Sequence, residues 1–361
     1  MELFDTYITQ EAKDLVNQVL DSGYISEGRM VQQFEDRLTK MFGYDYPVTT
    51  NSCTSALHLA LILSGVGQGD EVILPAQTFV ATAHTILYQG AIPVFADINP
   101  NTGNIEEGDI VHRITPKTKA IICVAWGGKP AELFTLSELC IKYGLTLIQD
   151  NAHALGAYYD GTPVSQWSYF SCYSFQAIKQ VTTGDGGLLV CNNRIDWERA
   201  RRLRWFDIDR EKDKPDFTGE RLYNLKEIGY KYHMNDIAAA LGLGNLQEFH
   251  TRNARRRKIA DYYDEFIKRV DVSFMDREGS SNWLYTLNVQ ERDRFIQKMW
   301  EKKIPASVVH VGIDRNELFG GIRSDLKGQR YFDRHHVCIP CHPSLTDEEV
   351  DYIVENINYG W

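Results

Sequence analysis

The fold is best indicated by the stretch Leu145-Thr-Leu-Ile-Gln-Asp150-Asn-Ala-His153-Ala-Leu-Gly156. A short apolar run that ends in turn residues is typical of a buried strand, and here it ends at the carboxylate of Asp150. Similar runs and helical patterns alternate upstream, with strands predicted at 71–74, 92–95 and 120–124 and helices at 54–63, 80–87 and 133–143. This alternation predicts an α/β fold with a mostly parallel central sheet covered on both faces.

The flanking segments predict how the chain is divided. Amphipathic patterns predict helices at 11–20, 30–40, 236–246, 292–302 and 346–357, and short apolar runs predict strands at 283–289 and 307–309. We expect a large α/β domain over residues 1–245 and a smaller C-terminal α+β domain over 246–361. The basic run 252–258 has apolar residues at helical spacing behind it, which favours a solvated helix face over an anion-binding patch.

Composition excludes several classes of protein. The 361 residues carry 39 Lys and Arg against 49 Asp and Glu, a net charge of −10, which argues against binding to nucleic acid. No apolar stretch reaches the roughly 18 residues of a membrane helix, and the acidic N-terminus lacks a signal segment. We therefore expect a cytoplasmic protein with no membrane partner.

The cysteines indicate neither a disulfide framework nor a metal centre. There are seven, an odd number scattered along the chain. A cluster of His335, His336, Cys338, Cys341 and His342 could bind a metal, but a structural zinc site usually needs a second ligand pair at matching spacing. We expect no metal site, and predict a short strand at 337–339 in its place.

Three segments carry candidate chemistry. Small polar residues at Ser52–Thr54 begin a helix, where free N–H groups can bind a phosphate, although such residues also serve as helix caps. Asp150 lies at the carboxyl end of a strand, where open α/β sheets bind ligands, or caps the next helix. Lys179 follows a strand-like run from Ser174 and precedes a Gly-rich turn; a desolvated lysine condenses with aldehydes, whereas a typical lysine is a surface charge.

Together these groups match the needs of one cofactor, pyridoxal 5′-phosphate (PLP), which requires a lysine, an acid near its ring nitrogen and phosphate donors. The sequence resembles the DegT/DnrJ/EryC1/StrS family of sugar-nucleotide aminotransferases, which have the aspartate-aminotransferase-like PLP fold of type I. The resemblance rests on the stretches 23–28, 51–60, 74–82, 149–156, 174–187, 229–236 with 238–242, and 339–349, in family order.

The resemblance implies roles for particular residues. Lys179 would hold the cofactor covalently and then move protons, and Asp150 would pair with the ring nitrogen. His153 would lie near the phenolic oxygen, and Phe79 would stack on the ring. The phosphate would be bound by the backbone amides of Cys53 and Thr54 and by the side chain of Ser174. All the cofactor-binding residues named so far belong to one subunit. Family sites are completed across a homodimer interface, so Lys231 would come from the neighbouring subunit.

The sequence departs from the family pattern at three positions. Cys53 stands where the family usually has Gly, which leaves the backbone donor but adds a side chain. Lys231 replaces a usual Asn, and would bring a cation to the phosphate. His233 stands where Arg is common, so no role is carried over to it.

The resemblance also implies the reaction. A dehydratase branch of the family has His in place of the lysine, so Lys179 favours transamination from L-glutamate, through pyridoxamine 5′-phosphate, to a nucleotide-linked keto-sugar. The segment 22–28, with Ser26 as a candidate sugar contact, resembles members that form 4-amino sugars from 4-keto-6-deoxy hexoses. His310 is a second candidate contact, or a strand-edge residue with no catalytic task. The alternatives are a 3-keto-sugar aminotransferase, a PLP-dependent dehydratase or decarboxylase, and a PLP-binding regulator without turnover.

Overall fold

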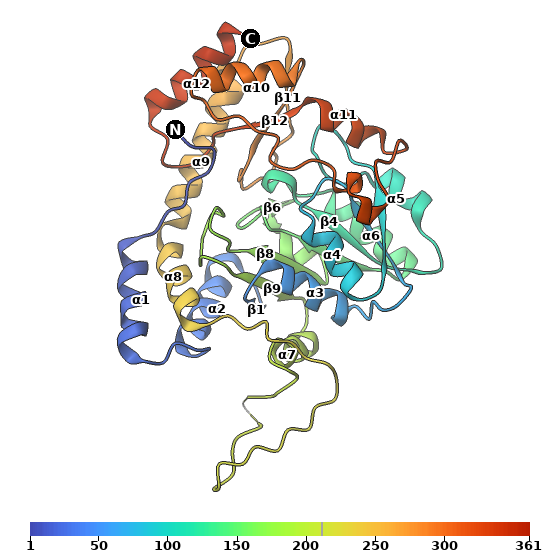
Figure 1. The fold of residues 1–361 in the computed structure, drawn as a ribbon, viewed down its shortest axis with the longest axis vertical. Helices are drawn as coiled ribbons and strands as arrows, with labels where there is room; N and C mark the ends of the chain where they lie inside the picture. Colours follow the sequence, from blue (N-terminus) through green and yellow to red (C-terminus); the bar gives the residue numbers. More distant parts are fainter. Residues whose placement is uncertain (211) are drawn as a thin grey trace.

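A central seven-stranded sheet organises the chain in the computed structural model, which describes residues 1–210 and 212–361 (Figure 1). The main strands are β1 (Tyr46–Thr50), β2 (Glu71–Pro75), β3 (Ile92–Ala96), β4 (Thr118–Val124), β5 (Thr146–Asp150), β8 (Phe170–Ser174) and β9 (Gly187–Cys191), and a small hairpin is formed by β6 (Tyr158–Tyr159) and β7 (Thr162–Pro163). The longer helices are α1 (Gln10–Ser22), α2 (Arg29–Phe42), α3 (Cys53–Leu63), α4 (Ala81–Tyr88), α5 (Glu107–Arg113), α6 (Leu133–Tyr143), α7 (Arg194–Leu203), α8 (Asp236–Asn245), α9 (Phe249–Phe266), α10 (Arg292–Glu301), α11 (Lys327–His335) and α12 (Asp347–Tyr359).

The strand order is β1-β9-β8-β5-β4-β2-β3. Neighbours from β8 to β3 are parallel, and only β9 runs against its two neighbours, β8 and β1. The sheet is thus mostly parallel, as the sequence predicts. Because parallel strands end at one edge, the carboxyl ends of β5 and β8 bring Asp150 and Ser174 to the same side of the sheet.

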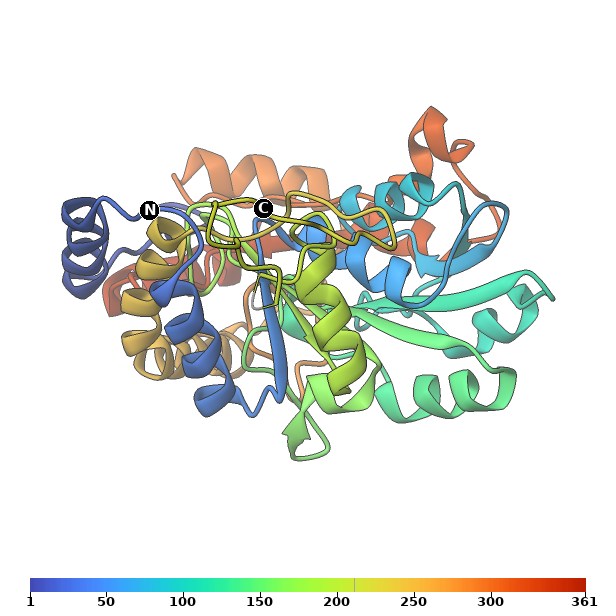
Figure 2. The same ribbon diagram turned by 90° about the horizontal axis from the view of Figure 1, so that it is seen from below.

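Both faces of the sheet are covered by helices. Alternate residues of one strand point to opposite sides. Ile121 therefore belongs to the core formed with α1, α2, α5, α6 and α8, whereas Ile122 belongs to the core formed with α3, α4 and α7. The second view shows the sheet between these two helical layers (Figure 2). This three-layer arrangement confirms the α/β fold class.

Helix boundaries follow from local chemistry. The side chains of Thr9 and Asn235 accept hydrogen bonds from the first turns of α1 and α8. Gly43 and Gly144 adopt left-handed conformations that end α2 and α6, which a residue with a Cβ rarely does. The predicted helix ends agree with the structure to within a few residues.

The C-terminal part has a core of its own. Strands β10 (Val272–Phe274), β11 (Tyr285–Val289) and β12 (His336–Ile339) form an antiparallel sheet that packs with α9, α10 and α12. Both chain termini lie at this end of the molecule (Figure 1). The proposed domain boundary at 245/246 falls between α8 and the short 3₁₀ turn before α9, and it stays a prediction.

One local prediction is wrong, and a second fails at a single basic residue. Residues 307–309 form no strand; Ser307 makes an isolated bridge to Cys338, and the chain then turns sharply because Val309 has a φ of 55°. In the basic run on α9, Arg256 is buried rather than solvated, and burial lowers the pKa of its guanidinium to about 10. Among the described residues, no helix combines the length and apolar character needed to cross a membrane.

A long irregular segment between α7 and α8 extends away from the rest of the chain (Figure 1). Its apolar side chains are largely open to solvent: Phe217 is 100% exposed, Leu222 83% and Ile228 78%. An exposed apolar surface of this kind is typical of a region that another protein covers.

Candidate active site

The candidate site is a cavity of about 590 Å³ at the carboxyl edge of the central sheet. Its walls come from the start of α3, the ends of β5 and β8, and two C-terminal segments around Trp283 and residues 307–310. Eight residues predicted from the sequence line it: Cys53, Thr54, Phe79, Asp150, His153, Ser174, Lys179 and His310. Residues from widely separated parts of the sequence therefore meet here.

Lys179 presents its side-chain amine to this cavity from a turn after β8. In this turn the backbone N–H of Lys179 donates to the Gln176 carbonyl at 2.9 Å. Its Nζ lies 3.5 Å from the centroid of the Trp283 ring, and no described carboxylate forms an ion pair with it. Burial lowers the pKa of Lys179 to about 7, while Cys53 and Asp150 act in the opposite direction. A substantial share of the amine is therefore neutral and nucleophilic near pH 7.

Asp150 is buried at the end of β5 and is held by two donors. Thr82 Oγ1 donates to Oδ2 at 2.8 Å, and the Ala152 N–H donates to Oδ1 at 3.2 Å. Burial raises the pKa of Asp150, and these two hydrogen bonds oppose that rise. The carboxyl is thus fixed in direction and poised to pair with a cationic N–H in the cavity.

The start of α3 offers free donors. The Ser52 side chain accepts from the Ser55 N–H, but among the described residues the N–H groups of Cys53 and Thr54 have no partner. Strand β9 approaches the start of α3 closely at Gly187. Only glycine fits there, since a Cβ would lie 2.4 Å from the Cys53 nitrogen. A helix of eleven residues with free N–H groups at its start favours an anion.

The thiol of Cys53 is compatible with an anion at this point. Burial raises its pKa well above the usual value, so the thiol stays protonated and brings no negative charge. Ser174 is the last residue of β8 and is buried. Its Oγ accepts a hydrogen bond from the Gln176 N–H at 3.3 Å. The hydroxyl hydrogen of Ser174 is free to donate into the cavity.

Aromatic rings form the opposite wall. The His153 and Trp283 rings are 4.0 Å apart between centroids, and the Phe79 and His310 rings 5.5 Å apart. Burial and the nearby Lys179 amine lower the pKa of His153 well below its usual range, and lower that of His310 to about 4. Both imidazoles are neutral at pH 7. Phe79 remains 56% exposed and offers a free aromatic face.

The N-terminal segment closes part of the cavity with apolar side chains. Leu3 and Phe4 line it, and Phe4 stacks on Trp283 with centroids 5.3 Å apart. The segment is anchored by Asp5, which forms an ion pair with Arg252 and accepts a hydrogen bond from Ser344 Oγ at 2.6 Å. This side of the cavity is suited to an uncharged, apolar part of a ligand.

Two predicted site residues lie outside the cavity of their own chain. Ser26 is exposed in the turn between α1 and α2. Lys231 is exposed as well, with its Nζ 5.9 Å from the centroid of the Trp205 ring. The structure of one chain does not bring them to the other eight residues.

Several residues of the site were not predicted from the sequence. Thr82 fixes Asp150, and Trp283 lies against Lys179, yet no local sequence pattern marks either as a site residue. Thr82 belongs to a stretch that carried the family resemblance, which was its only signal. Trp283 and Phe4 come from regions with no motif, so only the folded chain identifies them.

The cysteine and histidine cluster near the C-terminus has other contacts. Cys338 Sγ lies 3.3 Å from Thr286 Oγ1, Cys341 Sγ contacts the Arg256 carbonyl, and His342 Nε2 lies 3.0 Å from the Glu2 carbonyl. Within residues 1–210 and 212–361, no group of three or more His, Cys, Asp or Glu side chains has an arrangement that could hold a metal ion.

The residues of the cavity fit PLP. Its aldehyde would meet the Lys179 amine, its ring nitrogen the Asp150 carboxyl, and its phosphate the free N–H groups at the start of α3. A glycine at 187 is required for β9 to pack against the backbone at the start of α3, since a Cβ there would clash with Ser52 and Cys53.

Comparison with known proteins agrees with this fit. The DegT/DnrJ/EryC1/StrS aminotransferase family matches residues 6–358. GDP-perosamine synthase of Escherichia coli O157:H7 is 31% identical over 99% of this chain and 97% of its own. The dTDP-4-dehydro-2,3,6-trideoxy-D-glucose 4-aminotransferase of Saccharopolyspora spinosa is 31% identical over 98% of this chain and 95% of its own.

Solved structures lead to the same result. Sugar aminotransferase CalS13 from Micromonospora echinospora superposes with a TM-score of 0.93 at 31% identity and covers 100% of both chains. The PLP form of Spr1654 from Streptococcus pneumoniae superposes with a TM-score of 0.90 at 28% identity, over 99% of this chain and 98% of its own. The expected type I PLP fold is confirmed. The chain belongs to the DegT/DnrJ/EryC1/StrS aminotransferase family, and it is a sugar aminotransferase.

Proposed function

We propose that this aminotransferase moves an amino group from L-glutamate to a nucleotide-linked 4-keto-6-deoxy hexose, with PLP as its resident cofactor. The observation that carries the proposal is the meeting, in one cavity, of a partly neutral lysine amine, a fixed carboxyl and free helix N–H groups, next to an apolar wall. Each of these features serves one part of the cofactor or the sugar.

The chain's own residues bind and orient the cofactor. When bound, PLP would supply an aldehyde and an electron-withdrawing ring that can carry an amino group between the two half-reactions. Cys53 and Thr54 amides with Ser174 would hold the phosphate, Phe79 would cover a ring face, and neutral His153 would lie at the ring edge. Asp150 would keep the ring nitrogen protonated, since Thr82 and the Ala152 amide fix its direction.

Lys179 is the residue that would move protons. Its pKa of about 7 allows Nζ to accept a proton in one step and return it in the next without a large cost either way. Phe4 and Trp283 cover part of the cavity and so reduce its exposure to bulk water. A water-poor site protects the reaction from hydrolysis of intermediates.

The apolar wall supports a deoxy sugar. Leu3, Phe4 and Val309 present carbon to the cavity, which matches a methyl group better than a hydroxyl. The names of two relatives given above, a perosamine synthase and a 4-aminotransferase, support a 4-keto substrate. His310 is proposed as a contact to the sugar. A 3-keto sugar remains the alternative substrate, and Lys179 disfavours dehydration or a non-catalytic role.

A panel of keto-sugars tests this proposal. The purified protein is incubated with PLP, L-glutamate and 4-keto-6-deoxy or 3-keto hexoses linked to dTDP, UDP or GDP, and products are identified by mass spectrometry. We expect a 4-amino-4,6-dideoxy sugar and an equal amount of 2-oxoglutarate. Amination of only 3-keto sugars, loss of water from the sugar, or no product with any substrate would contradict the proposal.

The rate of cofactor capture should depend on pH. Below pH 7 the Lys179 amine is mostly protonated and unreactive, and above it mostly neutral, because burial depresses its pKa to about 7. We expect the initial rate of covalent PLP capture by the cofactor-free protein to rise from pH 6 to 8 with a midpoint near 7. Absorbance of the lysine adduct measures the rate. A midpoint near 10, as for an exposed lysine, would contradict the assignment.

We propose further that the working unit is a homodimer with shared sites. The apolar side chains of Phe217, Leu222 and Ile228 are exposed on the segment between α7 and α8, and a second copy of the chain would cover them. Lys231 follows this segment, and Ser26 is exposed in the turn after α1. Both would then reach the partner's cavity. The cytoplasmic location and the lack of a nucleic-acid partner stay predictions from the sequence.

Mixed dimers test the shared site. Lys179→Ala and Lys231→Glu each inactivate a homodimer if both residues serve every site. Refolding the two variants together should restore activity. In a mixed dimer one site combines the intact Lys179 of one protomer with the intact Lys231 of the other, and the second site has neither. Lys231→Glu mixed with Lys231→Glu labelled by a second tag is the control, and should stay inactive. Failure of the two variants to complement each other in dimers of confirmed mixed composition would contradict sharing.

A further inference from the structure

A strained turn carries His310 into the candidate cavity. The His310 N–H bonds to the Val308 carbonyl at 2.6 Å, and the residue between them, Val309, has a φ of 55°. This three-residue turn with a positive central φ is the rare, strained form of the γ-turn. Valine, which is β-branched, is especially costly in that conformation. The turn therefore persists only because the surrounding structure holds it.

His336 makes the contacts that hold this turn. Its Nε2 lies 2.9 Å from the Val308 carbonyl oxygen and 2.9 Å from the His310 carbonyl oxygen, so one N–H spans both sides of Val309. The imidazole is completely buried, and it stacks on the Phe332 ring with centroids 4.1 Å apart. Its position is thus fixed by packing.

The neighbouring histidine shows which contact is special. His335 Nδ1 lies 2.7 Å from the Tyr331 carbonyl, and His336 Nδ1 lies 2.5 Å from the Phe332 carbonyl, so both rings contact the end of α11 in the same way. Of these two histidines, only His336 reaches the turn at 308–310, through its Nε2. An Nε2 proton serves two carbonyls there, whereas an Nδ1 proton serves one.

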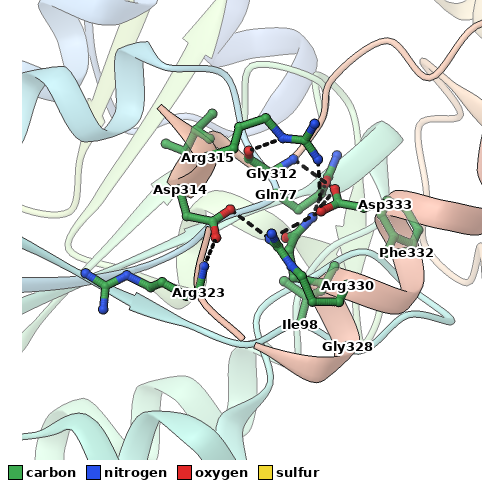
Figure 3. A network of polar contacts seen from close by, with 12 residues as sticks. Gln77, Ile98, Gly312, Asp314, Arg315, Arg323, Gly328, Arg330, Phe332 and Asp333 are labelled. Atoms are coloured by element: carbon green, nitrogen blue, oxygen red, sulfur yellow. Dashed lines mark hydrogen bonds and ion pairs between the residues drawn. The ribbon is translucent and has the colours of Figure 1, made fainter. Parts of the chain in front are cut away.

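The chain beyond the turn is anchored separately. The Gly312 N–H donates to Asp333 at 3.1 Å, and Arg330 bridges Asp333 and the buried Asp314 (Figure 3). Gln77 donates to the His310 carbonyl at 3.0 Å and accepts from Gln329. Among the described residues, His336 is the only side chain with an atom within hydrogen-bond distance of both carbonyls of the turn, and its Nε2–H tautomer donates to them. Loss of its ring would remove the contact that joins the Val308 and His310 carbonyls, and it would leave the anchored network, with the Gln77 bond to the His310 carbonyl, in place.

We propose that His336 is a positioning residue for the sugar half-reaction, which holds the 308–310 turn through Nε2 and so keeps the His310 ring against the sugar. The inference rests on the proposed function, in which His310 contacts the sugar. His336 itself does not touch the cavity. Its loss should weaken sugar binding and leave the reaction with glutamate unchanged.

Three variants test the proposal in the PLP-loaded enzyme. His336→Leu keeps the volume of the site but removes the side-chain nitrogen that contacts both the Val308 and the His310 carbonyl; the bonds from the His310 N–H and from Gln77 remain. His336→Gln places two N–H donors near the position of Nε2. His335→Leu is the matched control at the adjacent position. If His336→Leu does not fold, His336→Asn replaces it, since its shorter amide does not reach both carbonyls.

The kinetic readout separates the two half-reactions. With a dTDP- or GDP-linked 4-keto-6-deoxy hexose, His336→Leu should raise KM for the sugar about tenfold, and His336→Gln should recover most of that loss. The rate of amino transfer from glutamate should be unchanged in all variants. An unchanged sugar KM in His336→Leu, or an equal loss in both half-reactions, would overturn the proposal.

A second readout does not depend on the substrate. Hydrogen exchange at residues 307–311 should be faster in His336→Leu than in the wild type, His336→Gln or His335→Leu, while residues 312–333 keep their protection. Equal exchange in His336→Leu and the wild type would overturn the proposal that His336 holds the turn. If the wild type aminates no sugar but the exchange pattern is as expected, the proposed function is rejected, whereas the role of His336 in holding the turn is supported.

Discussion

Replacing Lys179 with Ala should abolish both covalent capture of PLP and turnover, lowering the rate by more than about 1,000-fold. The reason is that Lys179 supplies the only amine among the cavity-lining residues that the structure describes. Its environment gives it a pKa of about 7 and a position against the Trp283 ring. The substitution to Ala also removes a partly charged buried amine, so the free energy of unfolding should not fall greatly. Absorbance of the lysine adduct and the rate of 2-oxoglutarate release measure the effect.

Two further variants make this result specific. Lys179→Arg keeps a cation in the same place but cannot act as a neutral nucleophile, because a guanidinium stays protonated in proteins. It should be as inactive as Lys179→Ala. Lys13→Ala removes an exposed amine on α1 and should behave as the wild type. Turnover in Lys179→Ala within a few-fold of the wild type would refute the central assignment.

Replacing Asp150 with Asn should leave PLP bound but reduce the rate by about 100-fold or more. The amide has the shape of the carboxyl, yet it lacks the charge that keeps a ring nitrogen protonated. Asp150 is buried and its direction is fixed by Thr82 and the Ala152 N–H, so we expect the amide to occupy the same place without the charge. Single-turnover reaction with glutamate measures the effect on chemistry, and equilibrium dialysis measures cofactor binding.

Matched variants separate charge from structure. Thr82→Val removes one hydrogen bond to Asp150 but keeps its charge, and should cost about tenfold or less. Asp160→Asn makes the same exchange in an exposed turn with a φ of 47°, which Asn tolerates, and should have no effect. An Asp150→Asn enzyme with an unchanged rate would refute the proposed role. Loss of PLP with a normal rate per bound cofactor would refute it as well.

Much of the fold could be predicted because its strands are short, apolar and separated by clear helical patterns. The prediction extended to the site, since a residue at the carboxyl end of a parallel strand has a known place in an α/β sheet. Asp150 is such a residue, and it does line the cavity. The antiparallel insertion of β9 could not be read from periodicity, because a buried strand looks the same in either direction.

The remaining errors concern contacts between distant segments. The run at 307–309 has the composition of a strand, but the turn that His336 holds forces Val309 into a left-handed conformation. The basic pattern of 252–258 does not reveal that Arg256 packs beneath the C-terminal core. Trp283 and Phe4 reach Lys179 only through the tertiary fold. Local patterns predict elements well, but they do not predict which distant side chains meet.

Locating the lysine that captures the cofactor tests the account most directly. The wild type is incubated with PLP, the adduct is reduced with borohydride, and peptides are mapped by mass spectrometry, with Lys179→Arg treated in parallel. We expect one modified peptide that carries the cofactor on Lys179, and none in the variant. A pyridoxyl group on another lysine, or a wild type that takes up no PLP, would contradict it.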